Sequence, residues 1–251
     1  MTPMSIAILT VLGAVLGSFL NLCISRLPRG ESLLRPPSHC DGCGTRLRCP
    51  DLVPIVSYLA LRGRCRSCRA AIPLRSLFVE AVSAGALGYV GYRHGLTPQT
   101  VVLAVYLLVL LLVSVVDLEH GIIPDIVVFP MAAACIGLSA LLPEVGPERA
   151  LIGGAIGFAV MLGIYLAARG GMGGGDVKLA GLIGLAAGFP LVVPALLLAA
   201  VSGGVAAMAL LCAKRKESRD PVPFGPFLSA GAAASLLWGP ALMRLWLGVT
   251  P

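Results

Sequence analysis

Charged side chains are scarce in this sequence. Only 12% of its 251 residues are Asp, Glu, Lys or Arg, against about 25% in ordinary soluble domains. Hydrophobic residues make up 57% of the chain, and its mean hydropathy is +0.93. This composition excludes a soluble globular protein. It predicts an all-α, polytopic membrane protein with one inserted polar segment.

Aromatic residues are also few, at 6% of the chain, and they do not alternate with basic residues as in proteins that stack single-stranded nucleic acid. The net charge of +7 therefore does not indicate nucleic-acid binding. The basic residues gather in two groups, at 26–75 and at 214–219. Because basic residues beside membrane spans mark the cytoplasmic side, we predict that both groups lie there, facing anionic lipid.

The features of a cleavable leader are also scarce in the first apolar segment. The first apolar segment, residues 4–23, has no basic residue before it and no convincing small-residue cleavage site. We therefore expect a retained membrane span rather than a signal peptide.

Long hydrophobic runs follow, and crossing a bilayer takes about 20 apolar residues. The candidate spans are residues 4–25, 76–93, 98–116, 125–142, 149–168, 177–188, 190–212 and 226–247. The sixth is short, and the Gly-Phe-Pro run at 188–190 can be a tight turn or a kink. With a turn there are eight spans and both basic groups are cytoplasmic, whereas seven spans would place 214–219 outside.

We therefore predict about eight transmembrane helices, with the N-terminus outside. The chain would divide into residues 1–95, which hold the first two spans and the cytoplasmic loop 26–75, and residues 96–251, which hold the other six spans.

Four of the eight cysteines form two Cys-x-x-Cys pairs, Cys40 with Cys43 and Cys65 with Cys68. Two such pairs in a polar loop predict a tetrahedral zinc site. Their cytoplasmic side argues against disulfides, and redox-active or incidental pairs are the alternative. Four thiolates leave no open coordination position, so zinc would hold the loop together rather than catalyse. Cys49 could substitute as a ligand.

A glycine-rich run leads to the first of two acidic sites. Five of the six residues 170–175 are glycines, and Asp176 and Lys178 follow. An ionisable group at the end of an apolar span is costly and so is a functional candidate, although Asp176 could simply cap the next helix. The missing side chains at Gly173 and Gly175 would let an extended substrate backbone approach.

The second acidic site is Asp117, at the end of the third span, where the alternative is a solvated helix end. The predicted topology places Asp117 and Asp176 at one depth, at the cytoplasmic edge. Two confined carboxyl groups can share a proton, as in aspartic proteases. One then takes a proton from the attacking water while the other polarises the peptide carbonyl.

Two further stretches lie beside these acids in the predicted topology. Asp125 follows Pro124, and it could be a carboxylate favoured by the helix dipole or a group that supports the site. Three prolines surround Phe224 and Gly225, which predicts a stiff cytoplasmic lead into the last span, with a simple linker as the alternative.

Ordered motifs over most of the chain carry a family resemblance. They are residues 17–21 with 26–28, both Cys-x-x-Cys pairs, residues 54–59, Glu80, Asp117 with residues 123–125, residues 173–178 and residues 223–227. In this order they resemble the type IV prepilin peptidases, which are bifunctional leader peptidases and N-methyltransferases of type IV pilus, type II secretion and competence systems.

The resemblance implies a membrane aspartic endopeptidase of the bacterial inner membrane, with Asp117 and Asp176 as its catalytic pair. Prepilins or pseudopilins would be cut after a Gly on the cytoplasmic side, and S-adenosylmethionine would methylate the new N-terminus. Residues expected to bind substrate or support the acids are Gly173, Gly175, Lys178, Asp125, Phe224 and Gly225. Lys178 or Arg75 could recognise a Glu that follows the cut.

The resemblance assigns methyl transfer to residues 1–95, where Gly17, Asn21, Arg26 and Glu80 are the cofactor-binding candidates. Two functions of other classes remain open from the residues alone. Intramembrane acids also occur in small carriers, although no clear inverted repeat is visible, and a zinc-held membrane scaffold would need no chemistry.

Overall fold

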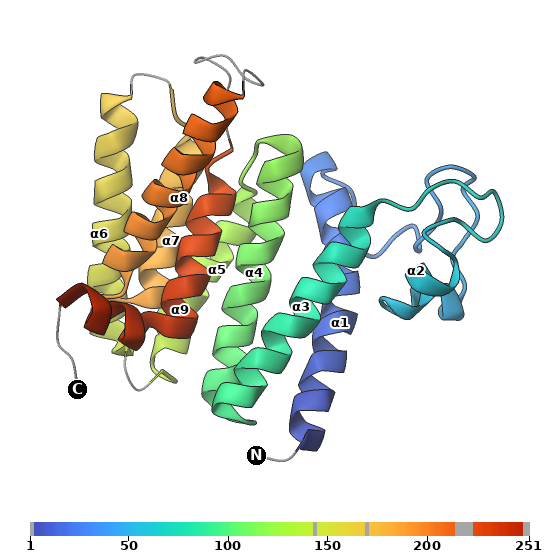
Figure 1. The fold of residues 1–251 in the computed structure, drawn as a ribbon, viewed down its shortest axis with the longest axis horizontal. Helices are drawn as coiled ribbons and strands as arrows, with labels where there is room; N and C mark the ends of the chain where they lie inside the picture. Colours follow the sequence, from blue (N-terminus) through green and yellow to red (C-terminus); the bar gives the residue numbers. More distant parts are fainter. Residues whose placement is uncertain (1–2, 143–144, 169–170, 214–222, 248–251) are drawn as a thin grey trace. The chain divides into compact units, whose positions relative to one another are not determined.

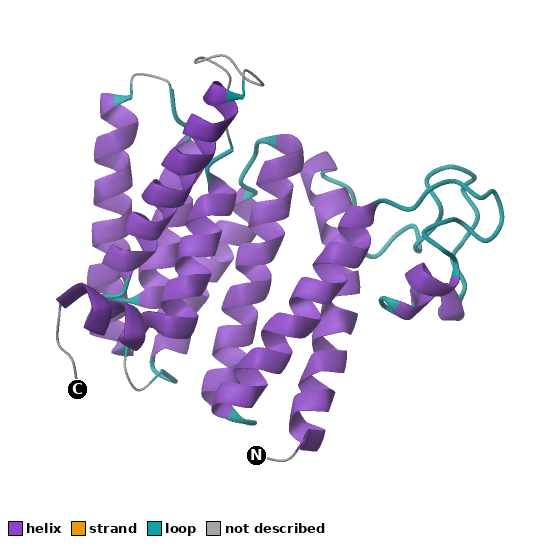
Figure 2. Cartoon of the chain, viewed as in Figure 1, coloured by secondary structure: helices purple, strands orange, loops and turns teal. Residues whose placement is uncertain are grey.

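The computed structural model describes residues 3–142, 145–168, 171–213 and 223–247. Within these ranges the chain is helix and loop, and its only extended pairings are two isolated β-bridges in the loop between the first two long helices (Figure 2). The predicted all-α architecture is confirmed. Contacts divide the chain into two compact units, Met1–Leu108 and Val109–Pro251.

The first unit is built on two long helices, α1 (Pro3–Arg26) and α3 (Leu74–His94). Glycines on α1 let the two backbones approach closely. A Cβ at Gly17 would lie 2.8 Å from Cα of Glu80, and one at Gly13 would collide with the carbonyl oxygen of Ser83. Small residues at such crossings are typical of helix pairs in membranes, where packing rather than hydrophobic burial drives association.

The polar segment between α1 and α3 contains three short helical elements. These are η1 (Leu27–Arg29), η2 (Cys49–Leu52) and α2 (Val56–Ala60), and α2 stands apart from the two long helices in Figure 1. The first unit also includes the start of α4 (Pro98–His120), whose remainder belongs to the second unit.

The second unit holds the end of α4 and five further helices, drawn from green to red in Figure 1. They are α5 (Asp125–Ser139), α6 (Gly146–Ala167), α7 (Gly174–Ala187), α8 (Val192–Cys212) and α9 (Gly225–Leu247). Helix α7 is the most deeply buried of the five, with side chains such as Leu179 and Ile183 fully enclosed. Close approach of α6 to α7 depends on small residues, because a Cβ at Gly153 would collide with the carbonyl oxygen of Gly184.

A helix occupies each of the eight predicted spans. Five of them, α1, α4, α6, α8 and α9, are long and apolar enough to cross a membrane. The chain is therefore a multi-pass membrane protein, while the count of eight crossings stays a prediction. The chain does break at residues 188–191, where α7 ends and α8 begins as a separate helix. The predicted functional division after residue 95 also stays a prediction, and the basic group at 214–219 lies outside the described residues.

Candidate active site and metal centre

Asp117 lies in the last turns of α4 with only 5% of its surface exposed. Its Oδ2 atom accepts a hydrogen bond of 2.9 Å from the backbone N–H of Gly225, the first residue of α9. The first N–H groups of a helix have no partner within the helix, and that end of the helix favours negative charge. Asp117 therefore supplies the start of α9 with the acceptor that it needs.

This contact requires a glycine at position 225. A Cβ there would lie 2.6 Å from Oδ2 and 3.0 Å from Cγ of Asp117. No larger residue fits without moving the carboxyl group or the start of α9. The sequence singled out Gly225 for its proline-rich surroundings, but its contact with Asp117 explains why a side chain is absent.

Asp176 lies in the first turn of α7 and is 7% exposed. The N-cap residue of α7 is Gly173, and the Asp176 backbone N–H donates to its carbonyl oxygen over 3.2 Å. The N–H of Gly173 is in turn directed at the Asp176 carboxyl. The alternative that Asp176 is the cap residue is therefore wrong, because it lies inside the helix and its carboxyl group is buried.

The carboxyl group of Asp176 lies within electrostatic range of the charge of Asp117. Two residues distant in the sequence, one at the end of α4 and one at the start of α7, thus bring their acids together in the second unit. Both are buried, so water screens their repulsion weakly. Two buried carboxyl groups this close are stable only when they share a proton or bind a partner that offsets their repulsion.

An ion pair joins the starts of α5 and α7 near these acids. Nζ of Lys178 lies 2.8 Å and 2.9 Å from the two carboxylate oxygens of Asp125. The same Nζ lies 5.4 Å from the centre of the Phe129 ring. Asp125 is thus a first-turn carboxylate of α5 and the partner of Lys178, while its support of the acidic site stays a prediction.

The remaining residues predicted to bind substrate have packing partners in the structure. A Cβ at Gly175 would lie 3.0 Å from Cβ of Ile123, so this glycine lets α7 approach the loop before α5. A Cβ at Gly203 on α8 would lie 2.7 Å from the Phe224 ring. Ile123 and Gly203 were not among the predicted site residues, because their roles depend on which helices meet.

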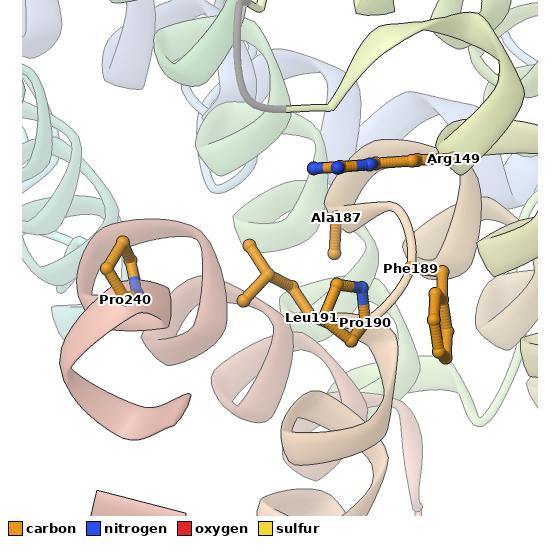
Figure 3. A pocket seen from close by; sticks show the side chains of 6 residues that line it. All are labelled: Arg149, Ala187, Phe189, Pro190, Leu191 and Pro240. Atoms are coloured by element: carbon orange, nitrogen blue, oxygen red, sulfur yellow. The ribbon is translucent and has the colours of Figure 1, made fainter. Parts of the chain in front are cut away.

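A cavity lies at the opposite end of α7 from Asp176. It has a volume of about 370 Å³, and its lining includes Arg149, Phe189 and Pro240 (Figure 3). Asp176 is separated from the last residue of α7, Ala187, by about 16 Å along the helix axis. This cavity is therefore not part of the acidic site.

The four predicted metal ligands come together in the first unit. The Sγ atoms of Cys40, Cys43, Cys65 and Cys68 all lie within 4.8 Å of one another. Sγ of Cys40 and Sγ of Cys68 are 3.8 Å apart. Zinc–sulfur bonds of about 2.3 Å in a tetrahedron give sulfur–sulfur distances of about 3.8 Å, so the spacing suits zinc. Cys49 is not in this cluster.

Each Cys-x-x-Cys pair closes the same kind of backbone turn. In the first pair, the backbone N–H of Gly44 donates a 2.8 Å hydrogen bond to the carbonyl oxygen of Cys40. In the second, the backbone N–H of Arg69 donates a 3.1 Å hydrogen bond to the carbonyl oxygen of Cys65. Gly44 and Arg69 also share a left-handed backbone, with φ of 67° and 62°. The loop therefore contains two equivalent Cys-x-x-Cys knuckles that could hold a metal, one with glycine and one with arginine at the same left-handed position.

Hydrogen bonding favours the thiolate at two of the four sulfurs, those of Cys43 and Cys65, whereas the neighbouring cysteines raise the pKa of Cys68 to about 11. Hydrogen bonding by the side chain and backbone of Thr45 lowers the pKa of the Cys43 thiol to about 6. Backbone N–H groups of Cys68 and Ser67 lower the pKa of Cys65. Because zinc binds the deprotonated form, both effects suit a metal site.

The four residues predicted to bind a methyl donor lie where α1 meets α3. Gly17 packs on the backbone of Glu80, whose Oε2 accepts a 2.7 Å hydrogen bond from the N–H of Ile55. The Arg26 guanidinium donates to the carbonyls of Ser32 and Pro36 over 2.9 Å and 2.7 Å. These contacts fasten the polar loop to the helices, so three of the four residues have structural roles.

Asn21 is different. Its Nδ2 donates to the carbonyl of Ser76 over 3.0 Å, but its Oδ1 is buried and has no hydrogen-bond partner. An unpaired buried acceptor is costly and is usually satisfied by a ligand or water. Asn21 is thus the one candidate with an open polar atom.

Known protein families match residues of both compact units. The bacterial peptidase A24 N-terminal domain matches residues 11–94, and the type IV leader peptidase family matches residues 104–208. A prepilin leader peptidase/N-methyltransferase of Pseudomonas aeruginosa is 32% identical over 98% of this chain and 94% of its own length. The chain belongs to the type IV leader peptidase family.

Other members of this family are similarly close. Proteins with the same name are 34% identical in Burkholderia pseudomallei, over 95% of this chain and 87% of the relative, and 31% identical in Bacillus subtilis, over 96% and 98%. No solved structure matches the chain. The N-terminal match includes all four clustered cysteines, and the leader peptidase match includes Asp117 and Asp176 but ends before Gly225. Membership makes this a bacterial membrane peptidase and confirms the resemblance inferred from the motifs.

Proposed function

We propose that this protein is the aspartic endopeptidase that removes the leaders of type IV prepilins or pseudopilins, with Asp117 and Asp176 as its catalytic residues. The observation that carries the proposal is the meeting of two buried carboxyl groups from different helices within a chain of this family. Among the described residues neither acid forms an ion pair with an arginine or lysine, so a structural ion pair does not account for them.

In the proposed reaction one of the two carboxyl groups is ionised and the other keeps a proton. The ionised group takes a proton from a water molecule, whose oxygen attacks the carbonyl carbon of the scissile peptide. The protonated group donates a hydrogen bond to the carbonyl oxygen, and its proton supports departure of the new amine. Burial strengthens both interactions because little water competes with them.

The neighbouring residues hold these acids in place. The N–H of Gly225 fixes the orientation of the Asp117 carboxyl, and the N-cap at Gly173 fixes the first turn that carries Asp176. We propose that Lys178 positions the start of α7 through Asp125 rather than binding an acidic side chain of the substrate, since its ammonium group already has a carboxylate partner. Phe224 anchors the start of α9 against α8 through its contact with Gly203.

Orientation is part of the proposal. An outside N-terminus puts the Cys-rich loop, the end of α4 and the start of α7 at the cytoplasmic surface, where cleavage after Gly would take place. The excess of arginine in residues 26–75 supports this side.

The first unit would carry the structural zinc and the methyl transfer. Zinc would be held by the four clustered thiolates, and it would stabilise the loop. S-adenosylmethionine, when bound, would supply the methyl group for the new N-terminal amine. Asn21 is the residue that would hold it, because its Oδ1 can accept a hydrogen bond from an ammonium or hydroxyl group.

The test is cleavage of a model prepilin by the purified full chain in lipid nanodiscs, read as a leader shift on a gel. Asp117→Asn and Asp176→Asn should each reduce cleavage by at least about a thousandfold, because each removes one partner of the proton exchange. Both should retain wild-type zinc content and thermal stability. Near-normal cleavage by either variant would refute the two-carboxylate mechanism.

A further inference from the structure

The four clustered cysteines lie in the loop between α1 and α3, residues 27–73, which we name the zinc loop. Its short helix α2 exposes apolar side chains. Val56 and Leu59 are each 61% exposed, although the loop around them is polar. On α3, Leu74 and Phe78 are 74% and 59% exposed. A group of large apolar side chains that a folded chain leaves exposed marks a surface that lipid or another molecule covers.

The attachment of α2 shows where these side chains lie relative to the membrane helices. Ile55, directly before α2, donates a 2.7 Å hydrogen bond to Glu80. Glu80 lies about 9 Å along the axis from Leu74, where α3 begins, and its side chain leans back toward that start. The beginning of α2 therefore lies beside the first two turns of α3. This position is past the first residue of α3, in the direction in which the helix is expected to enter the membrane.

Positive charge follows the apolar helix at once. Arg62, Arg64 and Arg69 are exposed, and among the described residues none of the three has an acidic or hydrogen-bonding partner for its guanidinium group. Residues 26–75 contain ten arginines against three acids, Glu31, Asp41 and Asp51. A guanidinium group can donate two parallel hydrogen bonds to the oxygens of one phosphate, and basic residues near an anionic lipid surface strengthen membrane binding.

Two of these arginines have a backbone that their side chains disfavour. Arg62 and Arg69 have φ of 53° and 62°, a left-handed conformation that is unfavourable for a residue with a Cβ. The knuckle position equivalent to Arg69 is Gly44, which adopts the same conformation without that cost. An arginine at a position that suits glycine indicates that the side chain itself is needed.

We propose that α2 and the arginines after it form a membrane-interface anchor that binds the anionic lipid of the leaflet on the loop's side. Val56 and Leu59 enter the acyl boundary, and Arg62, Arg64 and Arg69 bind the lipid phosphates. The anchor holds the zinc loop against the bilayer. It is independent of the peptidase mechanism, and an acidic protein partner is the competing occupant that the experiment must exclude.

The experiment uses the full chain in nanodiscs whose lipids carry bromine on the acyl chain, which quenches a nearby tryptophan. Leu59→Trp probes α2, and Asp41→Trp probes an exposed residue at the tip of the first knuckle. Both native tryptophans remain, and each signal is taken as the difference from the parent protein. We expect quenching several-fold stronger at position 59 than at position 41. Equal quenching, or quenching of position 59 by aqueous iodide and not by bromolipid, would overturn the proposal, and the second result is the one that a protein-binding surface gives.

A second measurement tests the arginines. Replacing zwitterionic phosphatidylcholine by phosphatidylglycerol should increase quenching in Leu59→Trp, and added salt should reverse the increase. The increase should disappear when Arg62→Gln and Arg69→Gln are added. It should persist when Arg93→Gln is added instead, because Arg93 lies at the other end of α3. Unchanged zinc content reports that the loop is folded in every variant, and lipid-independent quenching in all of them would overturn the role of the arginines.

Discussion

Gly225 and Asp117 lie 108 residues apart in the sequence, yet the N–H of Gly225 donates a 2.9 Å hydrogen bond to the Asp117 carboxylate. The contact connects the end of α4 with the start of α9. It orients one acid of the proposed pair, and it provides α9 with an acceptor that no residue within that helix can supply.

Gly225→Ala should lower the rate of leader cleavage by roughly 5- to 150-fold, because an added Cβ would lie 2.6 Å from Oδ2 of Asp117. This range corresponds to the cost of overpacking, about 1–3 kcal/mol, if the strain falls on the oriented carboxyl group. The measurement is cleavage of a model prepilin at saturating substrate.

The matched control is Gly204→Ala on α8, where an added Cβ meets nothing within 4 Å. This variant should cleave at the wild-type rate. Equal activity of the two alanine variants would show that the Gly225 contact does not orient the acid.

Much of this fold follows from the sequence for a physical reason. In a bilayer every backbone polar group needs a partner, so a long apolar run must be helical. That constraint predicted all eight long helices to within a few residues at most ends. The four clustered cysteines were equally predictable, because Cys-x-x-Cys spacing constrains two thiolates locally.

The contacts that build the sites were not predictable in this way. The bond between Ile55 and Glu80 and the bond between Gly225 and Asp117 depend on which helices pack together, and nothing local encodes that choice. Gly17 illustrates the difficulty. The family resemblance makes it a cofactor-binding candidate, and in the structure the missing side chain makes room for the backbone of α3.

Cys43→Ser and Cys68→Ser should each remove bound zinc, because three thiolates hold the metal far less tightly than four at tetrahedral spacing. Metal analysis of the purified chain measures this directly. Methylation should fall more than cleavage, because the cysteines and the two aspartates belong to different compact units.

Cys49→Ser is the control for this experiment, since Cys49 lies outside the cluster of four thiols. It should retain full zinc content. A loss of zinc from this variant, or retention of zinc by both ligand variants, would contradict the four-thiolate site.

Lys178→Ala should destabilise the protein only slightly, by at most about 1 kcal/mol, because the pair with Asp125 is partly exposed at 37% and 52% of the two side chains. If Lys178 has the proposed positioning role, cleavage should fall by the same factor for a prepilin with Glu after the cut and for one with Gln there. Steady-state rates on the two substrates test this.

The charge-reversed variant, Asp125→Lys with Lys178→Asp, supplies the control. It rebuilds the ion pair and should recover part of the lost cleavage on both substrates. A selective loss on the Glu substrate that charge reversal does not repair would instead show that Lys178 recognises the substrate.

The ion pair between Asp51 and Arg66 in the zinc loop should be insensitive to pH across the neutral range. The Arg66 guanidinium lies 2.7 Å from the Asp51 carboxylate and holds the pKa of that carboxyl below its ordinary value. A group with a lowered pKa in the folded state contributes its stability above the unfolded value, about 3.9, and loses it only as the pH falls through the folded value.

Arg66→Gln should therefore speed limited proteolysis of the loop by a factor that is constant between about pH 5 and 8. Arg46→Gln, which removes an exposed arginine whose side chain has no partner among the described residues, should leave the proteolysis rate unchanged. An effect of Arg66→Gln that shrinks steadily from pH 8 to pH 5 would mean that the carboxylate titrates in that range and is not held ionised by the arginine.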